Sequence, residues 1–123
     1  MSKVLQLDCD GASARLVPAA GGRISALRLM RPNGVAIEAL HPYPEDFFDP
    51  IRWAKGGIYP LMPYSNRIAQ ATVNVSGEAV ALKAHPDAAP HSLHGNAHAL
   101  EWRLEAFDAT SAVMTVDSPA SAA

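Results

Sequence analysis

Apolar and polar residues alternate in short segments along most of this chain. The clearest segments are residues 4–7, 14–17, 24–30 and 35–39. Alternation with a period of two places the apolar side chains on one face of a β-strand. No segment has the sustained three- and four-residue spacing, with caps, that an amphipathic helix needs. The pattern therefore predicts an all-β fold.

Two hairpins are predicted in the later part of the sequence. Residues 71–75 and 78–82 alternate on either side of a Ser-Gly pair, and glycine tolerates the positive φ of a two-residue turn. Residues 102–106 and 112–116 form the second candidate pair, with a polar loop between them. Hairpins of this kind are typical of antiparallel sheets.

Prolines mark the connections between these segments. Five of the 10 prolines fall between residues 42 and 63, and Pro86 and Pro90 follow. Proline cannot donate to a sheet ladder, so these stretches are expected to be loops. We expect one domain over residues 1–123, an antiparallel β-sandwich, with residues 118–123 as a tail or a truncation point.

The composition limits the classes of partner and the cellular compartment. The formal net charge is -2 without a basic block, so neither nucleic acid nor a membrane surface is an expected partner. Cys9 is the only cysteine, which excludes an intrachain disulfide and suits a reducing compartment. Neither a signal peptide nor an apolar stretch of membrane-spanning length is recognisable, so a cytoplasmic location is predicted.

A first loop carries two residues suited to binding hydroxyl groups. Asn66 offers an amide donor and acceptor, and Arg67 offers a planar array of donors, so together they could fix neighbouring sugar hydroxyls. The alternative is a turn asparagine beside a solvated arginine. Four aromatic residues could supply an apolar face for a sugar ring, although tryptophans such as the two here are more often packing residues: Trp53, Tyr59, Tyr64 and Trp102.

A second loop is rich in histidine. His91, His94 and His98 could each exchange a proton near neutral pH. They could also bind zinc, but there is no adjacent thiolate and no recognised zinc spacing, so no metal is predicted. A surface or internally satisfied role is favoured for four of the histidines: His41, His85, His91 and His98.

Four elements together resemble the aldose 1-epimerase family in order and approximate spacing: residues 21–27, 60–68 and 91–95, and Trp102. The family pattern often has a second glycine at the position of Asn96. The resemblance spans nearly the whole chain, but members of the family are much longer. It therefore implies the amino-terminal part of a galactose mutarotase-like supersandwich.

The resemblance also implies an activity and a site. Asn66, Arg67 and His94 match sugar-contacting positions of the family, which interconverts the α and β anomers of hexoses such as galactose or glucose without a cofactor. The acid histidine and the base glutamate of the family lie beyond Ala123, so no catalytic residue is expected here and this chain alone should be inactive. The missing carboxy-terminal portion could also be a separate chain.

Two other functions fit the same residues. A non-catalytic carbohydrate-binding module would keep the three residues and drop the reaction. A hexose-6-phosphate epimerase would need further basic residues for the phosphate, and no dedicated cluster is recognisable.

Overall fold

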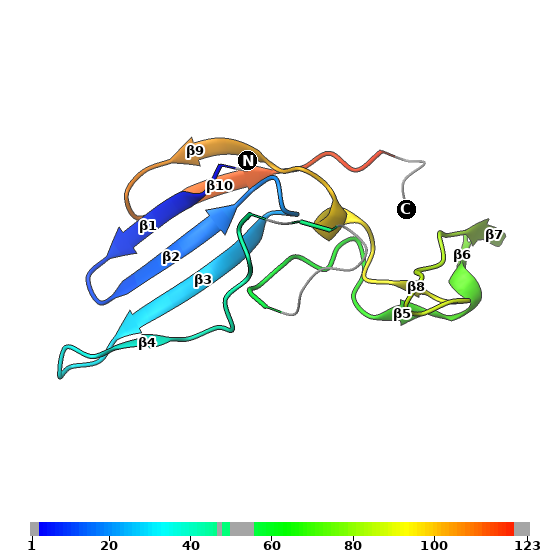
Figure 1. Ribbon diagram of the computed structural model, residues 1–123. Helices are drawn as coiled ribbons and strands as arrows, with labels where there is room; N and C mark the ends of the chain where they lie inside the picture. The colour runs from blue at the N-terminus through cyan, green and yellow to red at the C-terminus, as the bar shows by residue number, and fades with distance from the viewer. Residues whose placement is uncertain (1–2, 47, 50–55, 120–123) are drawn as a thin grey trace.

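The computed structural model describes residues 3–46, 48–49 and 56–119. It contains strands β1 (Leu5–Cys9), β2 (Ala12–Val17), β3 (Arg23–Met30), β4 (Ala36–Glu38), β5 (Arg67–Ile68), β6 (Thr72–Val75), β7 (Glu78–Ala81), β8 (Ser92–Leu93), β9 (Arg103–Phe107) and β10 (Ala112–Thr115), and the 3₁₀ helices η1 (Ala69–Ala71) and η2 (Ala97–Ala99). The longer strands gather at one end of the molecule and the loops at the other (Figure 1). No helix in the described part of the chain could span a membrane.

The main sheet is an antiparallel meander in the order β1-β2-β3-β4. Leu5 faces Leu16 across β1 and β2, and a β-bulge interrupts the β2–β3 ladder between Arg15 and Leu16. The four strands occupy the segments where alternation predicts them, which confirms the all-β prediction for this part of the chain.

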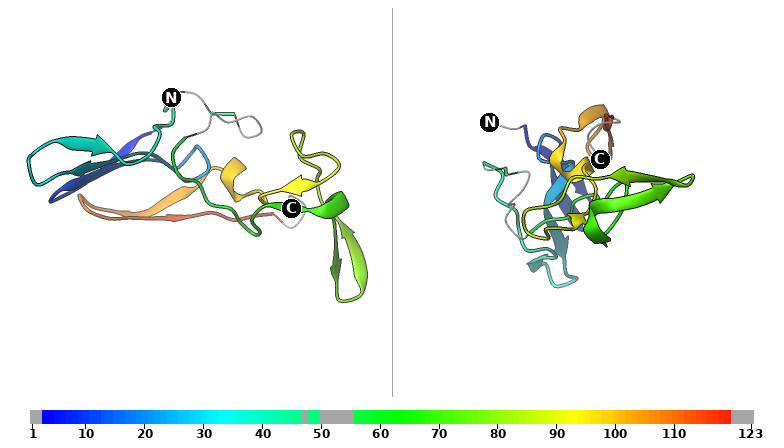
Figure 2. Two further views of the ribbon diagram at one scale, coloured as in Figure 1. Left: turned by 90° about the horizontal axis from the view of Figure 1, so that it is seen from below. Right: turned by 90° about the vertical axis from the view of Figure 1, so that its right-hand side faces the viewer.

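The hairpin of β9 and β10 forms a second layer. Figure 2 shows it running alongside the main sheet but offset from its plane. The Asp8 backbone amide donates to the carbonyl of Ala109 in the β9–β10 turn at 2.7 Å, which joins the two layers at one end. The predicted antiparallel, sandwich-like fold class is therefore confirmed.

The β6–β7 hairpin is also confirmed, and its turn shows why the Ser-Gly pair was informative. Ser76 and Gly77 have φ values of 52° and 87°, as a two-residue turn of the primed type requires. The side-chain oxygen of Asn74 accepts from the Gly77 amide at 2.9 Å. Ala71, predicted as the first strand residue, instead ends η1 with a φ of 49°.

The buried core lies where the main sheet meets the loops. Leu5, Leu16 and Val17 are buried there. By contrast, Phe107 and Val113 on the β9–β10 hairpin remain 47% and 54% exposed. This second layer therefore leaves large apolar side chains uncovered, which is unusual for the middle of a sandwich.

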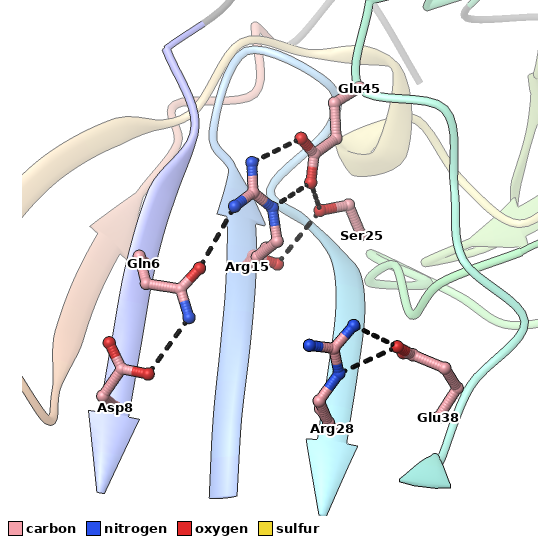
Figure 3. A network of polar contacts seen from close by, with 7 residues as sticks. All are labelled: Gln6, Asp8, Arg15, Ser25, Arg28, Glu38 and Glu45. Carbon is pink, nitrogen blue, oxygen red and sulfur yellow. Dashed lines mark hydrogen bonds and ion pairs between the residues drawn. The ribbon is translucent and has the colours of Figure 1, made fainter. Parts of the chain in front are cut away.

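A polar network on the main sheet fixes the chain that follows β4 (Figure 3). Arg15 and Glu45 form a two-pronged ion pair, with Nε–Oε1 at 2.6 Å and Nη2–Oε2 at 2.7 Å. The buried Ser25 hydroxyl donates to the same carboxylate at 2.8 Å, and the Tyr43 amide donates to the Ser25 carbonyl at 2.8 Å. Hydrogen bonds thus hold residues 43–45 against β3. A separate pair, Arg28–Glu38, joins β3 to β4.

Candidate sugar site

The two loops singled out in the sequence meet in the structure. Strands β5 and β8 pair antiparallel, with Arg67 opposite Leu93. One step away, Met62 and Gly95 form an isolated bridge, and the Met62 carbonyl accepts from the amides of Asn96 at 3.0 Å and Ala97 at 3.1 Å. Backbone hydrogen bonds therefore hold the first loop against the second.

Gly95 is the point of closest approach between these loops. Its φ is 62°, and a Cβ atom at this position would lie 2.1 Å from the Met62 carbonyl oxygen. Only glycine fits there. The neighbouring Asn96 has a φ of −133°, which any residue can adopt, so the loop does not need the second glycine that is common in the family.

Asn66 and His94 hold each other through two hydrogen bonds. The His94 amide donates to the Asn66 carbonyl at 2.9 Å, and the Asn66 amide donates to Nδ1 of His94 at 2.8 Å. Both residues have a positive φ, 69° and 62° respectively. Because Nδ1 accepts a hydrogen bond, the neutral ring carries its proton on Nε2, which is therefore a donor.

Arg67 completes the predicted group. The side-chain oxygen of Asn66 accepts from the Arg67 amide at 2.9 Å and from its guanidinium at 3.3 Å. Partial burial lowers the pKa of His94, and electrostatic interactions with Arg67 and His85 lower it further. The structure thus brings Asn66, Arg67 and His94 together, with a neutral imidazole beside an exposed guanidinium.

The other histidines of the second loop have structural contacts. Nδ1 of His91 accepts from the Gln70 amide at 3.0 Å, and Nδ1 of His85 accepts from the Asp87 amide at 3.1 Å. In both residues, Nδ1 therefore accepts a hydrogen bond from a backbone amide. Among the residues that the structure describes, no group of three histidine, cysteine or acidic side chains is placed to hold a metal ion.

His98 is the most buried histidine of the described residues. It is only 2% exposed, and burial lowers its pKa to about 4, so it is neutral at physiological pH. It hydrogen bonds to the backbone of His94, and its ring lies 6.0 Å from that of Tyr59, centroid to centroid. His98 therefore lies inside the protein and not on its surface.

The aromatic candidates for a sugar platform are mostly used in packing. Trp102 covers Gly22, where an added Cβ would lie 2.8 Å from its ring, and its indole N–H donates to the Ala97 carbonyl at 2.8 Å. Trp102 also lines an open cleft of about 630 Å³, to which none of the three predicted sugar-contacting residues contributes. Tyr64 is half-buried, and Trp53 lies outside the described residues.

Sequence reasoning missed the importance of Arg23, the first residue of β3. Its side chain is fully buried, with the guanidinium 4.0 Å from the Tyr43 ring centroid and 4.3 Å from that of Tyr59. It donates to the Gly56 carbonyl at 3.0 Å. The available signal was an arginine at an inward position directly after a Gly-Gly pair, but nothing local shows which side chains cover it.

These features define an antiparallel all-β protein with a polar group of loop residues at one end of its sheets. Solved structures that share this fold include the following two. The GalM/aldose epimerase homologue from C. elegans matches 94% of this chain and 36% of its own, with a TM-score of 0.74 and 19% identity. The Slr1438 protein from Synechocystis sp. PCC 6803 matches 86% of this chain and 32% of its own, with a TM-score of 0.61 and 27% identity.

The chain thus has an aldose epimerase-like fold and spans about a third of the length of each neighbour. This confirms the predicted resemblance at the level of the fold and is consistent with an amino-terminal part of it. No protein-family model and no curated protein sequence matches the chain significantly.

Proposed function

We propose that this chain is the sugar-holding part of an aldose 1-epimerase that interconverts the anomers of a hexose such as galactose or glucose. The observation that carries the proposal is the mutual arrangement of Asn66, Arg67 and His94. Two loops far apart in sequence place a guanidinium and a neutral imidazole at one position, and the hydrogen bonds between Asn66 and His94 fix the geometry.

This geometry suits a neutral, hydroxyl-rich ligand. The Arg67 guanidinium can donate to two neighbouring hydroxyl oxygens because its N–H groups lie in one plane. Nε2 of His94 supplies a further donor toward a hydroxyl or the ring oxygen. The site would hold the sugar and polarise it, which supports ring opening when an acid and a base act on the ring oxygen and the C1 hydroxyl.

The proton-transfer groups are proposed to come from polypeptide outside these residues. None of the hydrogen bonds or ion pairs of Asn66, Arg67 and His94 in the described structure involves a carboxylate. The neighbouring structures are about three times as long as the matched region, and the exposed Phe107 and Val113 leave apolar surface for further strands to cover. The remaining part would be continuous with this chain or a separate chain bound to it.

A titration followed by NMR tests the sugar-holding role. Galactose and glucose should shift the Asn66 and His94 amide signals, and Arg67→Ala should weaken binding about tenfold or more, because hydrogen bonds from charged groups contribute about 1.5–3 kcal/mol. Arg31→Ala, which removes an exposed arginine from a distant turn, is the matched control. Equal affinity in the two variants would refute the role of Arg67.

Further measurements separate the proposed epimerase from the alternative functions. Exchange NMR on the longer protein should show faster anomer interconversion than buffer alone if the protein is an epimerase. Sugar binding without faster interconversion would favour a carbohydrate-binding module. Hexose 6-phosphate that binds more tightly than hexose would favour a hexose-6-phosphate epimerase, with His91 and His85 as the nearby groups to mutate next.

A further inference from the structure

Arg23 is a buried cation without an acidic partner in the described structure. Its Nε and Nη2 atoms have no hydrogen-bond partner there, and only Nη1 is bonded, to the Gly56 carbonyl. Burying a charge is costly unless other groups stabilise it. The rings of Tyr43 and Tyr59 supply that stabilisation here, since a desolvated cation is attracted to the face of an aromatic ring.

One of these rings is fixed by the main sheet. The Tyr43 amide donates to the Ser25 carbonyl, and two residues later Glu45 is clamped by Arg15 and Ser25. Figure 3 shows the contacts of Glu45 with Arg15 and Ser25. The Tyr43 ring, which packs against the Arg23 guanidinium, is therefore held in place by the main sheet.

The second ring leads toward the candidate sugar site. Tyr59 lies on the guanidinium of Arg23 and also meets the ring of His98, tilted by 55° at 6.0 Å. His98 in turn hydrogen bonds to the backbone of His94. From the other side, Gly21 approaches His98 so closely that an added Cβ would lie 1.9 Å from the His98 carbonyl oxygen. His98 is thus held between the sheet turn and the Tyr59 ring.

We propose that the stack of Arg23, Tyr59 and His98 is a positioning device that sets the backbone of His94, and through it the donor presented to the sugar. The three residues form an unbroken line of contacts from the first residue of β3 to the second loop. They act through His94 and do not touch the ligand themselves. The sugar part of this inference rests on the proposed function, whereas the positioning of His94 does not.

Hydrogen exchange of the Asn66 amide tests the positioning without any sugar, because this amide is bonded to Nδ1 of His94. Tyr59→Leu removes the aromatic face, and Tyr59→Phe, which keeps it, is the matched control. We expect Tyr59→Leu to accelerate Asn66 exchange about tenfold and Tyr59→Phe to leave it within about twofold. Nitrogen chemical shifts of the His94 ring should show a mixture of tautomers only in Tyr59→Leu.

The amide of Met30, bonded to the Gly11 carbonyl at 2.8 Å in the main sheet, reports on the rest of the fold. Its exchange should be unchanged in both variants. Unchanged Asn66 exchange in Tyr59→Leu would overturn the proposal, and so would equal acceleration at Asn66 and Met30, which would indicate a merely structural role. If either Tyr59 variant fails to fold, His98→Gln and His98→Leu take their place. His98→Gln keeps a hydrogen-bond donor and should preserve the single His94 tautomer better than His98→Leu.

A sugar titration of the same variants separates this inference from the proposed function. If the wild-type chain binds no sugar, the proposed function fails while the exchange result still decides the positioning. If it binds, Tyr59→Leu should weaken binding in parallel with the loss of Asn66 protection.

Discussion

The amide of Asn66 donates to Nδ1 of His94, and the amide of His94 donates back to the carbonyl of Asn66. These two reciprocal hydrogen bonds join the two loops. The bond to Nδ1 also fixes the tautomer of His94. Both residues have a positive φ, a conformation that costs a non-glycine residue energy and therefore has to be stabilised by its surroundings. Such local strain is typical of residues that a protein holds in place for function.

Removal of the His94 ring should loosen this junction. In His94→Ala the Asn66 amide loses its acceptor, and we expect a loss of about 1 kcal/mol in the free energy of unfolding, the usual net value of one hydrogen bond. Urea denaturation followed by tryptophan fluorescence measures the change. His41→Ala, at an exposed position, is the control and should lie within about 0.5 kcal/mol of the wild type. Equal losses in both variants would contradict a specific role for the His94 acceptor.

Gly95→Ala should damage the site more than an alanine at another glycine of positive φ. Gly34 has a φ of 81° with nothing within 4 Å of an added Cβ, so Gly34→Ala should cost only the left-handed strain of about 1–2 kcal/mol. Gly95→Ala adds a clash with the Met62 carbonyl and should cost roughly 3 kcal/mol. Thermal denaturation of the two variants compares these losses, and a Gly95→Ala protein as stable as Gly34→Ala would show that the loops separate freely.

Local sequence signals predicted most of the strands. The Ser-Gly pair located the β6–β7 turn because the required positive φ values depend only on the residues of the turn itself. Period-two alternation located β1 to β4 for the same reason, since it depends on neighbouring residues. The grouping of Asn66, Arg67 and His94 came from the family resemblance, because spacing alone favoured a turn asparagine beside a solvated arginine.

The buried stack could not be predicted in this way. Arg23 begins a strand, and charged residues are usually exposed, so its residue type alone favours solvent. Its burial depends on Tyr43 and Tyr59, which reach it only after the chain has folded back over β3. His98 is similar, because its burial results from contacts with Tyr59 and the backbone of Gly21. These are long-range relationships, which patterns of neighbouring residues do not contain.

Burial of His98 predicts that acid destabilises the fold. Its pKa is about 4 in the folded chain against an ordinary value of 6.5, so between these values the unfolded chain binds more protons at this residue. The stability that this difference contributes is fully present above pH 6.5 and is lost as the pH falls toward 4. The total is roughly 3 kcal/mol, and the lowered pKa of His94 adds in the same direction. Urea midpoints measured across this window should therefore fall steeply for the wild type and less steeply for His98→Gln, which cannot titrate. Parallel profiles for the two proteins would show that His98 is protonated as readily in the folded chain as in the unfolded one.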